Sequence, residues 1–290
     1  MSLQHITSRQ NARVKDAVKL RDRRQRERQG RFLIDGARET VRALAAGIEV
    51  VEAFLCEARC TSAEAREAVA ALRASHAVLA TVADEVYGKL AFGDGRDGLV
   101  AVARTPRRTL SQLVLPANAL IAVLEGIEKP GNIGAVLRSA DGAGVDAVIL
   151  ADPRTDLFNP NTIRASLGAV FHANIATASS AEARALLAGR GSTAYAARPG
   201  AALDYAAADY RGAAAVVLGS EAAGLSEAWQ GPGVTPISLP MLGIADSLNV
   251  SATAAVLFYE ARRQRGGATA PRGADEARGA ATPAMPRPSR

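Results

Sequence analysis

The chain has 290 residues, 48% of them hydrophobic and 22% charged, with a formal net charge of +6. This composition is typical of a globular protein of about two domains, and it excludes a wholly disordered chain, a collagen and a disulfide-rich scaffold. No stretch is long and apolar enough to predict a membrane span, and the N-terminus lacks the apolar segment of a secretory signal, so we expect a cytoplasmic protein.

The positive charge is concentrated at the two ends of the chain. Residues 9–31 contain ten Lys or Arg side chains against three acids, and residues 261–290 contain seven Arg against two acids. A basic segment attached to an acidic body suggests a polyanionic partner such as nucleic acid, although a solvated basic helix would have the same composition. The candidate RNA contacts in this segment are Arg9, Arg13, Lys15, Arg23 and Arg24.

Helices and strands alternate in the first hundred residues. We expect a polar helix over 9–29 and a helix over 63–74 that is capped by Ser62. The other expected elements are strands at 31–34, 50–56, 76–82 and 98–104 and a helix at 37–46. These elements predict a compact α/β domain over residues 1–105, followed by a linker at 106–117.

The second half of the chain alternates in the same way. The runs at 119–126 and 213–220 are almost continuously apolar, as expected for strands buried on both faces of a parallel sheet. Further strands are expected at 145–150, 172–178, 192–197 and 235–240, and helices at 132–143, 159–167, 181–188 and 247–263. This pattern predicts an α/β domain with a parallel sheet over residues 118–265. The Gly-, Ala- and Pro-rich residues 266–290 are expected to form a disordered basic tail.

Several familiar motifs are absent or misplaced. Gly93, Gly95 and Gly98 have the spacing of the dinucleotide-binding G-x-G-x-x-G motif, but they precede a strand instead of following one, so we interpret them as a turn or mobile loop. No phosphate-binding G-x-x-x-x-G-K-[ST] motif occurs. Cys56 and Cys60 have no His nearby and the three His are scattered, so we expect neither a metal site nor a Ser-His-Asp triad.

Three segments of the second half place polar residues after predicted buried strands, which is where α/β domains bind ligands. The first is EGIEKPGNIGAVLRSADGAG, residues 125–144. Asn132 is expected at the turn and Arg138 within the helix that follows. An Arg at this place can hold a phosphate or orient a hydroxyl group. Taken alone, the segment is equally compatible with a structural role for Arg138.

The second segment is VVLGSEAAGLS, residues 216–226. Gly219 and Gly224 would let the backbone approach a ligand closely. Glu221 would pair with Arg138 or accept a hydrogen bond from a ribose hydroxyl. The structural alternative for Glu221 is a carboxylate that stabilises the N-terminus of a helix.

The third segment, residues 237–263, begins ISLPMLGIADSLNVS. Ser247 is a natural N-cap for the long helix expected here, and capping is its structural alternative. Asn249 falls in the first turn of that helix. Because Asn is a weak helix former, its presence there is harder to explain structurally.

Together and in this order, the three segments are similar to the three sequence motifs of the SPOUT superfamily, in its SpoU/TrmH branch. Members of this branch are S-adenosylmethionine-dependent RNA ribose 2′-O-methyltransferases. The motifs are N-x-G-A-x-x-R-S-A, L-G-S-E-x-x-G-L-S and I-x-L-P-M-x-G-x-x-x-S-L-N-V-S, and the resemblance covers about residues 118–264. More loosely, ITSRQNARVKDAVKL and RFLIDGARETVRAL resemble a ribosomal-protein-like RNA-binding domain that commonly precedes this catalytic domain, which makes residues 1–105 the expected substrate-binding domain.

The resemblance implies a deep trefoil knot in the C-terminal domain and a homodimer whose active site lies at the subunit interface. It implies S-adenosylmethionine as the cofactor, held by Leu218, Gly219, Leu239, Met241, Ser247 and Leu248. The catalytic residues that it implies are Arg138, Asn132, Glu221, Ser247 and Asn249.

Among these, Arg138 would be the base or the hydroxyl-activating group. Asn132 and Asn249 would position the ribose and phosphate, and Glu221 would hold Arg138. A guanidinium has a pKa above about 12 and cannot simply deprotonate an alcohol, so we favour an orienting role for Arg138.

Ribosomal RNA is the expected substrate because of the N-terminal extension, with transfer RNA as the alternative. A housekeeping role and a role in antibiotic resistance are both compatible with the two-domain layout. A non-catalytic RNA-binding or ribosome-assembly factor with the same fold is the alternative from a different class. No metal ion and no membrane partner are expected.

Overall fold

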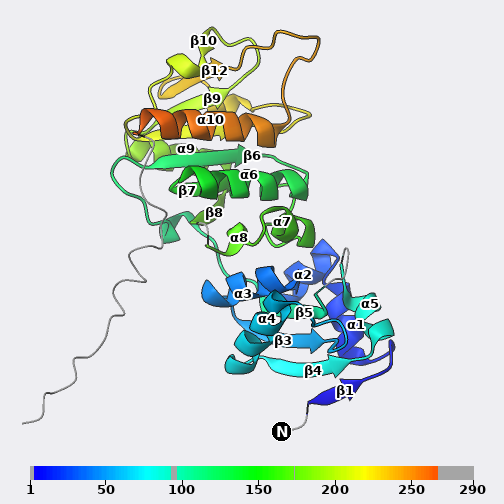
Figure 1. The fold of residues 1–290 in the computed structure, drawn as a ribbon. Helices are drawn as coiled ribbons and strands as arrows, with labels where there is room; N and C mark the ends of the chain where they lie inside the picture. Colours follow the sequence, from blue (N-terminus) through cyan, green and yellow to red (C-terminus); the bar gives the residue numbers. More distant parts are fainter. Residues whose placement is uncertain (1–2, 93–96, 173, 267–290) are drawn as a thin grey trace, which may run out of the picture.

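The computed structural model describes residues 3–92, 97–172 and 174–266, which form two α/β units, each built on its own sheet (Figure 1). The strands of the N-terminal unit are β1 (Gln4–Ile6), β2 (Arg31–Asp35), β3 (Val50–Leu55), β4 (Val78–Val82) and β5 (Leu99–Arg104). Its helices are α1 (Ala12–Lys19), α2 (Arg23–Gln29), α3 (Ala37–Ala45), α4 (Ala63–Ala74) and α5 (Asp84–Leu90). The sheet has the order β1-β4-β3-β5-β2 and is mixed, since β5 runs antiparallel to both of its neighbours.

The basic N-terminal segment forms two helices, not the single helix predicted over 9–29. The chain leaves α1 at Leu20 and re-enters a helix after Asp22, whose side chain accepts a hydrogen bond from the backbone N–H of Gln25. Asp is among the preferred N-cap residues, so this break follows from local sequence. The predicted helix 63–74 and its Ser62 cap are confirmed. Strand β1 and helix α5 were not predicted because neither is long enough to show a periodic pattern.

The C-terminal unit contains a seven-stranded sheet. Its strands are β6 (Leu120–Glu125), β7 (Ala147–Ala151), β8 (Ile175–Ala178), β9 (Thr193–Ala197), β10 (Leu203–Asp204), β11 (Ala214–Leu218) and β12 (Val234–Ser238). Its helices are α6 (Pro130–Ala143), α7 (Pro160–Ala165), α8 (Ala169–His172), α9 (Ser180–Gly189) and α10 (Val250–Gln264). Short 3₁₀ turns lie at η1 (Leu110–Gln112), η2 (Tyr205–Ala207) and η3 (Glu227–Trp229).

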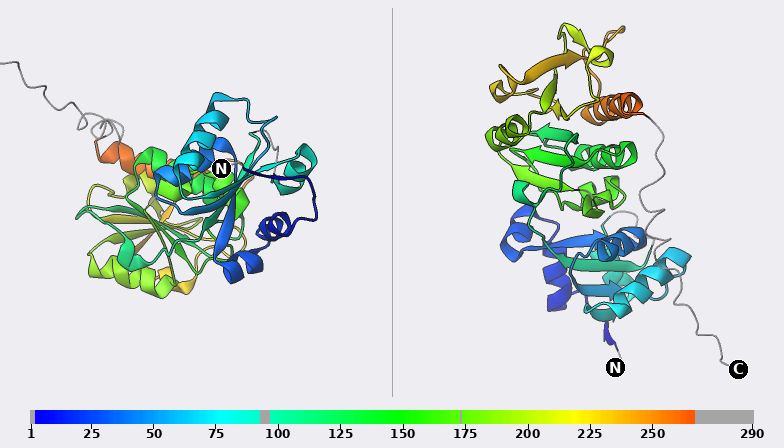
Figure 2. Two further views of the ribbon diagram at one scale, coloured as in Figure 1. Left: turned by 90° about the horizontal axis from the view of Figure 1, so that it is seen from below. Right: turned by 90° about the vertical axis from the view of Figure 1, so that its left-hand side faces the viewer.

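All strand pairs of this sheet are parallel, in the order β10-β12-β9-β11-β6-β7-β8. The predicted parallel sheet is therefore confirmed. Every residue of β6, β7 and β11 is buried, which explains their apolar sequences. Helix α6 packs between α7 and α10 on one face, while α9 and η3 cover the other (Figure 2).

Most element boundaries differ from the prediction by one or more residues, and four of the differences have a local explanation or affect the site. Helix α6 begins at Pro130, two residues early, because Pro is favoured in the first helical turn. The helix predicted at 159–167 ends at Ala165 and is followed by the separate helix α8, so the strand predicted at 172–178 starts only at Ile175. Helix α10 begins at Val250 instead of residue 247. The segment around the three spaced glycines falls largely on residues 93–96, which lie outside the described residues, as does the tail from residue 267.

The two units share one hydrophobic core. The Phe32 ring of β2 stacks on the Phe158 ring of the loop before α7, with centroids 4.5 Å apart, and Phe171 of α8 stacks next to both. Beside this stack the buried Arg26 guanidinium forms an ion pair with Asp156 at 2.5 Å. Because these contacts join residues of both units, we expect the joint to be rigid.

Two features are absent from residues 3–92, 97–172 and 174–266. None of the helices has the length and apolarity that crossing a bilayer requires. No group of His, Cys, Asp and Glu side chains is arranged to hold a metal ion.

Candidate active site

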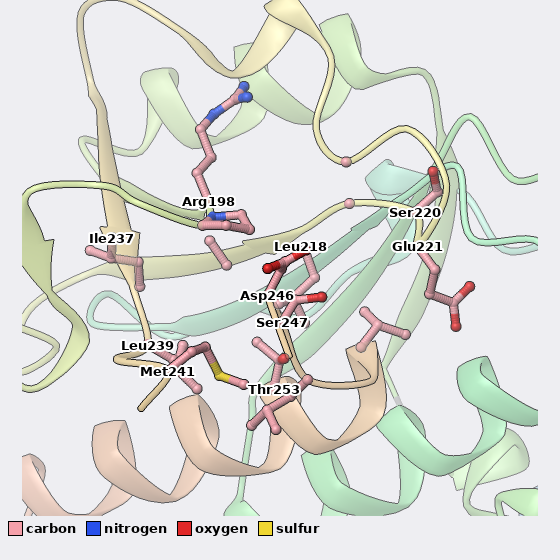
Figure 3. Close-up of a pocket in the computed structure, with 16 residues that line it drawn as sticks. Arg198, Leu218, Ser220, Glu221, Ile237, Leu239, Met241, Asp246, Ser247 and Thr253 are labelled. Atoms are coloured by element: carbon pink, nitrogen blue, oxygen red, sulfur yellow. The ribbon is translucent and has the colours of Figure 1, made fainter. Parts of the chain in front are cut away.

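Loops at the carboxyl edge of the parallel sheet surround a cavity of about 280 Å³ (Figure 3). These loops follow β9, β11 and β12, which are neighbours in the sheet. The cavity wall includes the six residues predicted to hold a cofactor, which are Leu218, Gly219, Leu239, Met241, Ser247 and Leu248. The fold therefore brings the second and third motif segments together around one space.

The loop after β11 folds back on itself at two glycines. A Cβ atom at Gly219 would overlap the backbone of Gly224 and Leu225. The backbone N–H of Gly224 donates to the Ser220 carbonyl at 2.9 Å, and Gly224 itself has a φ of +65°, which favours glycine. Both glycines are therefore required by the shape of the loop that forms the cavity wall.

A buried carboxylate that the sequence did not single out holds this loop. Glu125, at the end of β6, accepts hydrogen bonds from the Ser226 N–H at 2.8 Å, the Ser226 hydroxyl at 2.7 Å and the Ser180 hydroxyl at 2.6 Å. From the other side, the Arg198 guanidinium donates to the carbonyls of Leu225 and Ser226. The only local signal for Glu125 is an acidic residue that ends an apolar strand.

Polar residues of all three motifs meet beside the cavity. The Asn132 amide donates to the Glu221 carboxylate, and the Asn249 amide donates to the Asn132 side-chain oxygen at 3.4 Å. The Lys129 ammonium lies 3.9 Å from the same Glu221 carboxylate. Glu221 points away from the centre of the cavity (Figure 3). Within one chain Glu221 contacts Asn132 and Lys129 and not Arg138, so its predicted pairing with Arg138 stays a prediction.

Ser247 and Asn249 exchange the roles that the sequence suggested. Asn249 is the N-cap of α10, and its side-chain oxygen accepts hydrogen bonds from the Ser251 N–H at 2.9 Å and the Ser251 hydroxyl at 2.7 Å. Ser247 lies in the preceding loop and lines the cavity. Capping, the structural alternative for Ser247, is therefore performed by Asn249. Asn249 has a structural reason to be Asn, and it contacts Asn132 as well.

Arg138 is not brought to the cavity of its own chain. It is exposed on α6, and within the described residues its guanidinium forms no hydrogen bond or ion pair. Arg138 follows Asn132 by six residues on the same helix, which separates the two by about 9 Å along the helix axis. Its predicted catalytic role therefore requires a substrate or a second subunit that reaches this face.

Within the described residues, some predicted RNA contacts of the basic N-terminal segment are ion-paired and others are not. Arg13 pairs with Glu52, and its guanidinium lies 5.8 Å from the centre of the Phe54 ring. Arg23 pairs with Glu27 at 2.7 Å. The other predicted RNA contacts are exposed, and within the described residues their side chains form no hydrogen bond or ion pair; they are Arg9, Lys15 and Arg24.

Each of the two units matches a known protein family. The model of the MRM3-like substrate binding domain matches residues 11–101, and that of the SpoU rRNA Methylase family matches residues 119–259. A 23S rRNA (uridine(2479)-2′-O)-methyltransferase of Streptomyces viridochromogenes is 31% identical over 90% of this chain and 92% of its own length.

Two solved structures extend over nearly the same part of the chain. An RNA 2′-O ribose methyltransferase is 43% identical with a TM-score of 0.80, covering 90% of this chain and 99% of its own. The SpoU methyltransferase AviRb from Streptomyces viridochromogenes, in complex with AdoMet, is 28% identical with a TM-score of 0.81, covering 90% and 100%. The fold and the cavity thus define an α/β protein of the methyltransferase class. The chain belongs to the SpoU rRNA methylase family.

Proposed function

We propose that this protein transfers a methyl group from S-adenosylmethionine to a ribose 2′-hydroxyl of ribosomal RNA in the cytoplasm. The observation that carries the proposal is the convergence of the second and third motif segments around one cavity, in a chain of the SpoU rRNA methylase family. A relative that matches most of this chain is named as a 23S rRNA 2′-O-methyltransferase, which supports ribosomal RNA as the substrate.

The residues around the cavity fit S-adenosylmethionine. Gly219 leaves the wall without a side chain at the place where the loop turns, and Leu218, Leu239 and Leu248 supply apolar surface for an adenosine. Asp246 and Ser247 supply polar groups to the same space. When bound, the cofactor would supply an electrophilic methyl group at the sulfonium.

The polar cluster beside the cavity would position the target ribose. Asn132 and Asn249 each keep hydrogen-bonding capacity beyond the contacts that they make with Glu221 and with each other. Lys129, whose side chain is 70% exposed, adds a positive charge for an RNA phosphate. Holding the hydroxyl beside the methyl group converts a bimolecular reaction into one between oriented groups.

Arg138 would complete the site from the partner subunit of a homodimer. It lies on the exposed side of α6, one turn before Gly142, and the Tyr259 hydroxyl of α10 is close to Gly142. Val256 and Tyr259 are exposed apolar residues of α10, which suits an α6–α10 face covered by a second copy. A positive charge beside the hydroxyl would orient it and stabilise the developing oxyanion.

The decisive experiment is methylation of RNA by the purified enzyme with S-adenosylmethionine labelled in its methyl group. Unmodified 23S and 16S rRNA transcripts and total transfer RNA are supplied separately, and the modified nucleotide is mapped. We expect label in the ribose of one ribosomal RNA nucleotide. If only transfer RNA is labelled, the substrate is transfer RNA and not ribosomal RNA. Calorimetry that detects no S-adenosylmethionine binding would favour a non-catalytic RNA-binding factor.

A further inference from the structure

A second cavity of about 280 Å³ lies at the joint between the two units. Its walls come from α2, from the segment that leaves β5 and from the loop between β7 and α7. The lining residues include Arg23, Arg108, Thr105, Thr155, Leu157 and Phe158. None of the roles assigned above to the cofactor cavity uses this space.

The lining combines an apolar wall with hydroxyl groups, cations and two carboxylates, Glu27 and Asp156, which pair with Arg23 and Arg26. Leu157 and Phe158 are buried apolar side chains, while Thr105 and Arg23 are exposed at the opening. Arg26 also lines the cavity, but its guanidinium is fixed by Asp156 and by backbone carbonyls of the turn before α2. An apolar wall beside guanidinium groups is the chemistry that binds a nucleobase together with its phosphate.

A chain of contacts connects this cavity with the cofactor cavity. Arg23 donates to the Arg154 carbonyl at 2.7 Å, and the Arg154 guanidinium pairs with Glu128 at 2.5 Å. The next residue, Lys129, lies beside Glu221, which lines the cofactor cavity. We call Arg23, Arg154 and Lys129 the basic strip. Their side chains are 46%, 60% and 70% exposed, so all three reach solvent.

The strip follows one edge of the molecule. Lys129 and Arg154 lie in the loops after β6 and β7, which are adjacent strands, and β6 is next to β11 at the cofactor cavity. Two strand spacings amount to about 10 Å. Beyond this edge α2 contacts the loop before α7, through Arg23 at the Arg154 carbonyl and Arg26 at Asp156. The acids beside the strip are Glu27, Glu128 and Glu221, and each of them is within 3.9 Å of a strip cation.

We propose that the cavity at the joint binds a second nucleotide of the RNA substrate, a short distance along the strand from the methylated one. The basic strip holds the phosphates between these two nucleotides. This inference rests on the proposed function. It assigns a substrate contact to Arg154, which neither the motifs nor the cofactor cavity include, and it gives Arg23, a candidate RNA contact from the sequence, a defined place on the RNA path.

The test compares two double variants with the same loss of charge. Arg23→Ala/Arg154→Ala removes two strip cations, and Arg66→Ala/Arg73→Ala removes two exposed cations from α4 as the matched control. Methylation of a 23S rRNA transcript is measured as a function of RNA concentration and of salt. Binding of S-adenosylmethionine is measured by calorimetry.

We expect the strip variant to raise the KM for RNA about tenfold at 150 mM salt and to lower the slope of log KM against log salt by about 1.4, since each phosphate contact on a single strand contributes about 0.7. The kcat and the affinity for S-adenosylmethionine should stay unchanged, as should all values of the control. If the strip variant keeps the wild-type KM and salt slope, the basic strip does not bind the RNA phosphates and that part of the proposal is wrong.

A third variant tests the cavity itself. Thr105→Trp fills the opening without changing charge, so we expect a raised KM for RNA with an unaltered salt slope. If Thr105→Trp methylates RNA with the wild-type KM, the cavity holds no nucleotide and that part of the proposal is wrong. If the wild-type enzyme methylates no RNA at all, the proposed function fails, and this site fails with it.

Discussion

Arg138 is the residue that we propose activates the ribose hydroxyl, although it does not line the cavity of its own chain. Its guanidinium is exposed on α6 and forms no hydrogen bond or ion pair within the part of the chain that the structure describes. A side chain that is held by nothing in the folded monomer contributes little to stability. Its effect on catalysis and its effect on folding are therefore separable by mutation.

We expect Arg138→Ala to lower kcat for RNA methylation at least a hundredfold, because the oxyanion loses its positive partner. The affinity for S-adenosylmethionine should stay within a factor of about two, since Arg138 does not line the cofactor cavity. Turnover and calorimetry are the measurements, with Arg73→Ala as the exposed-arginine control. A variant that keeps near wild-type turnover would remove Arg138 from the mechanism.

Asp35 makes stability depend on pH. Burial raises the pKa of this carboxyl to about 6, although the Phe92 N–H donates to it. The unfolded chain has a pKa near 3.9. The folded state therefore binds the proton more tightly, and the stability that this gives is full below about pH 4 and is lost as the pH rises through 6.

We expect Asp35→Asn to be more stable than the wild type at pH 7.5, by up to about 3 kcal/mol, and to match it near pH 4. Urea unfolding at a series of pH values measures this difference. The control is Asp16→Asn, whose carboxylate is exposed beside Lys19. An equal gain at both pH values would show that the titration of Asp35 is not the cause.

At the scale of elements, the shape of the loop after β11 depends on hydrogen bonds that join it to a neighbouring strand and helix. Glu125 of β6 joins this loop to the start of α9 through three hydrogen bonds. A buried donor left without its acceptor costs about 1–3 kcal/mol, so the loop keeps its shape only while the side chain at this position accepts from the Ser226 N–H.

We expect Glu125→Ala to lower the affinity for S-adenosylmethionine at least tenfold and to destabilise the protein by about 3 kcal/mol. Glu125→Gln should restore most of the affinity, because an amide oxygen can accept from the Ser226 N–H while the serine hydroxyls turn to accept from the amide. Calorimetry and thermal unfolding test both variants. Equal loss of affinity in Ala and Gln would mean that the charge itself, and not the hydrogen bonding, is required.

Local sequence signals predicted those elements that begin at a capping residue or contain a long run or regular spacing of apolar residues. Helix α4 was correct to the residue because Ser62 marks its start, and the buried strands of the parallel sheet follow from their apolar runs. Short elements such as β1 and α8 offer too few residues for a pattern to emerge. Helix α10 was placed three residues early because Ser247, a good capping residue, precedes Asn249, which is the N-cap in the structure.

The candidate site was predictable only in part. The motif residues of the cavity wall followed from the family resemblance. The contacts of Glu125 and of Glu221 did not, since their partners lie about a hundred residues away in the chain. The trefoil knot and the homodimer stay predictions.

At the scale of the whole molecule, the exposed position of Arg138 predicts that two chains cooperate in one active site. Heterodimers are purified with two different tags, one chain carrying Arg138→Ala and the other Gly219→Val. If Arg138 acts on the cofactor of its partner, one of the two sites is intact and about half of the wild-type activity returns. Each variant alone should be inactive. Inactive heterodimers would place Arg138 in the site of its own chain.

The stacked rings of Phe32, Phe158 and Phe171 have a consequence for the choice of target. If the joint is as rigid as these contacts lead us to expect, the distance between the two units is fixed and the RNA has to match it. Immature or protein-covered ribosomal RNA that presents its contact points at another separation would be rejected. The stage of ribosome assembly at which the methyl group is added would then be set by this aromatic joint, far from the sulfonium.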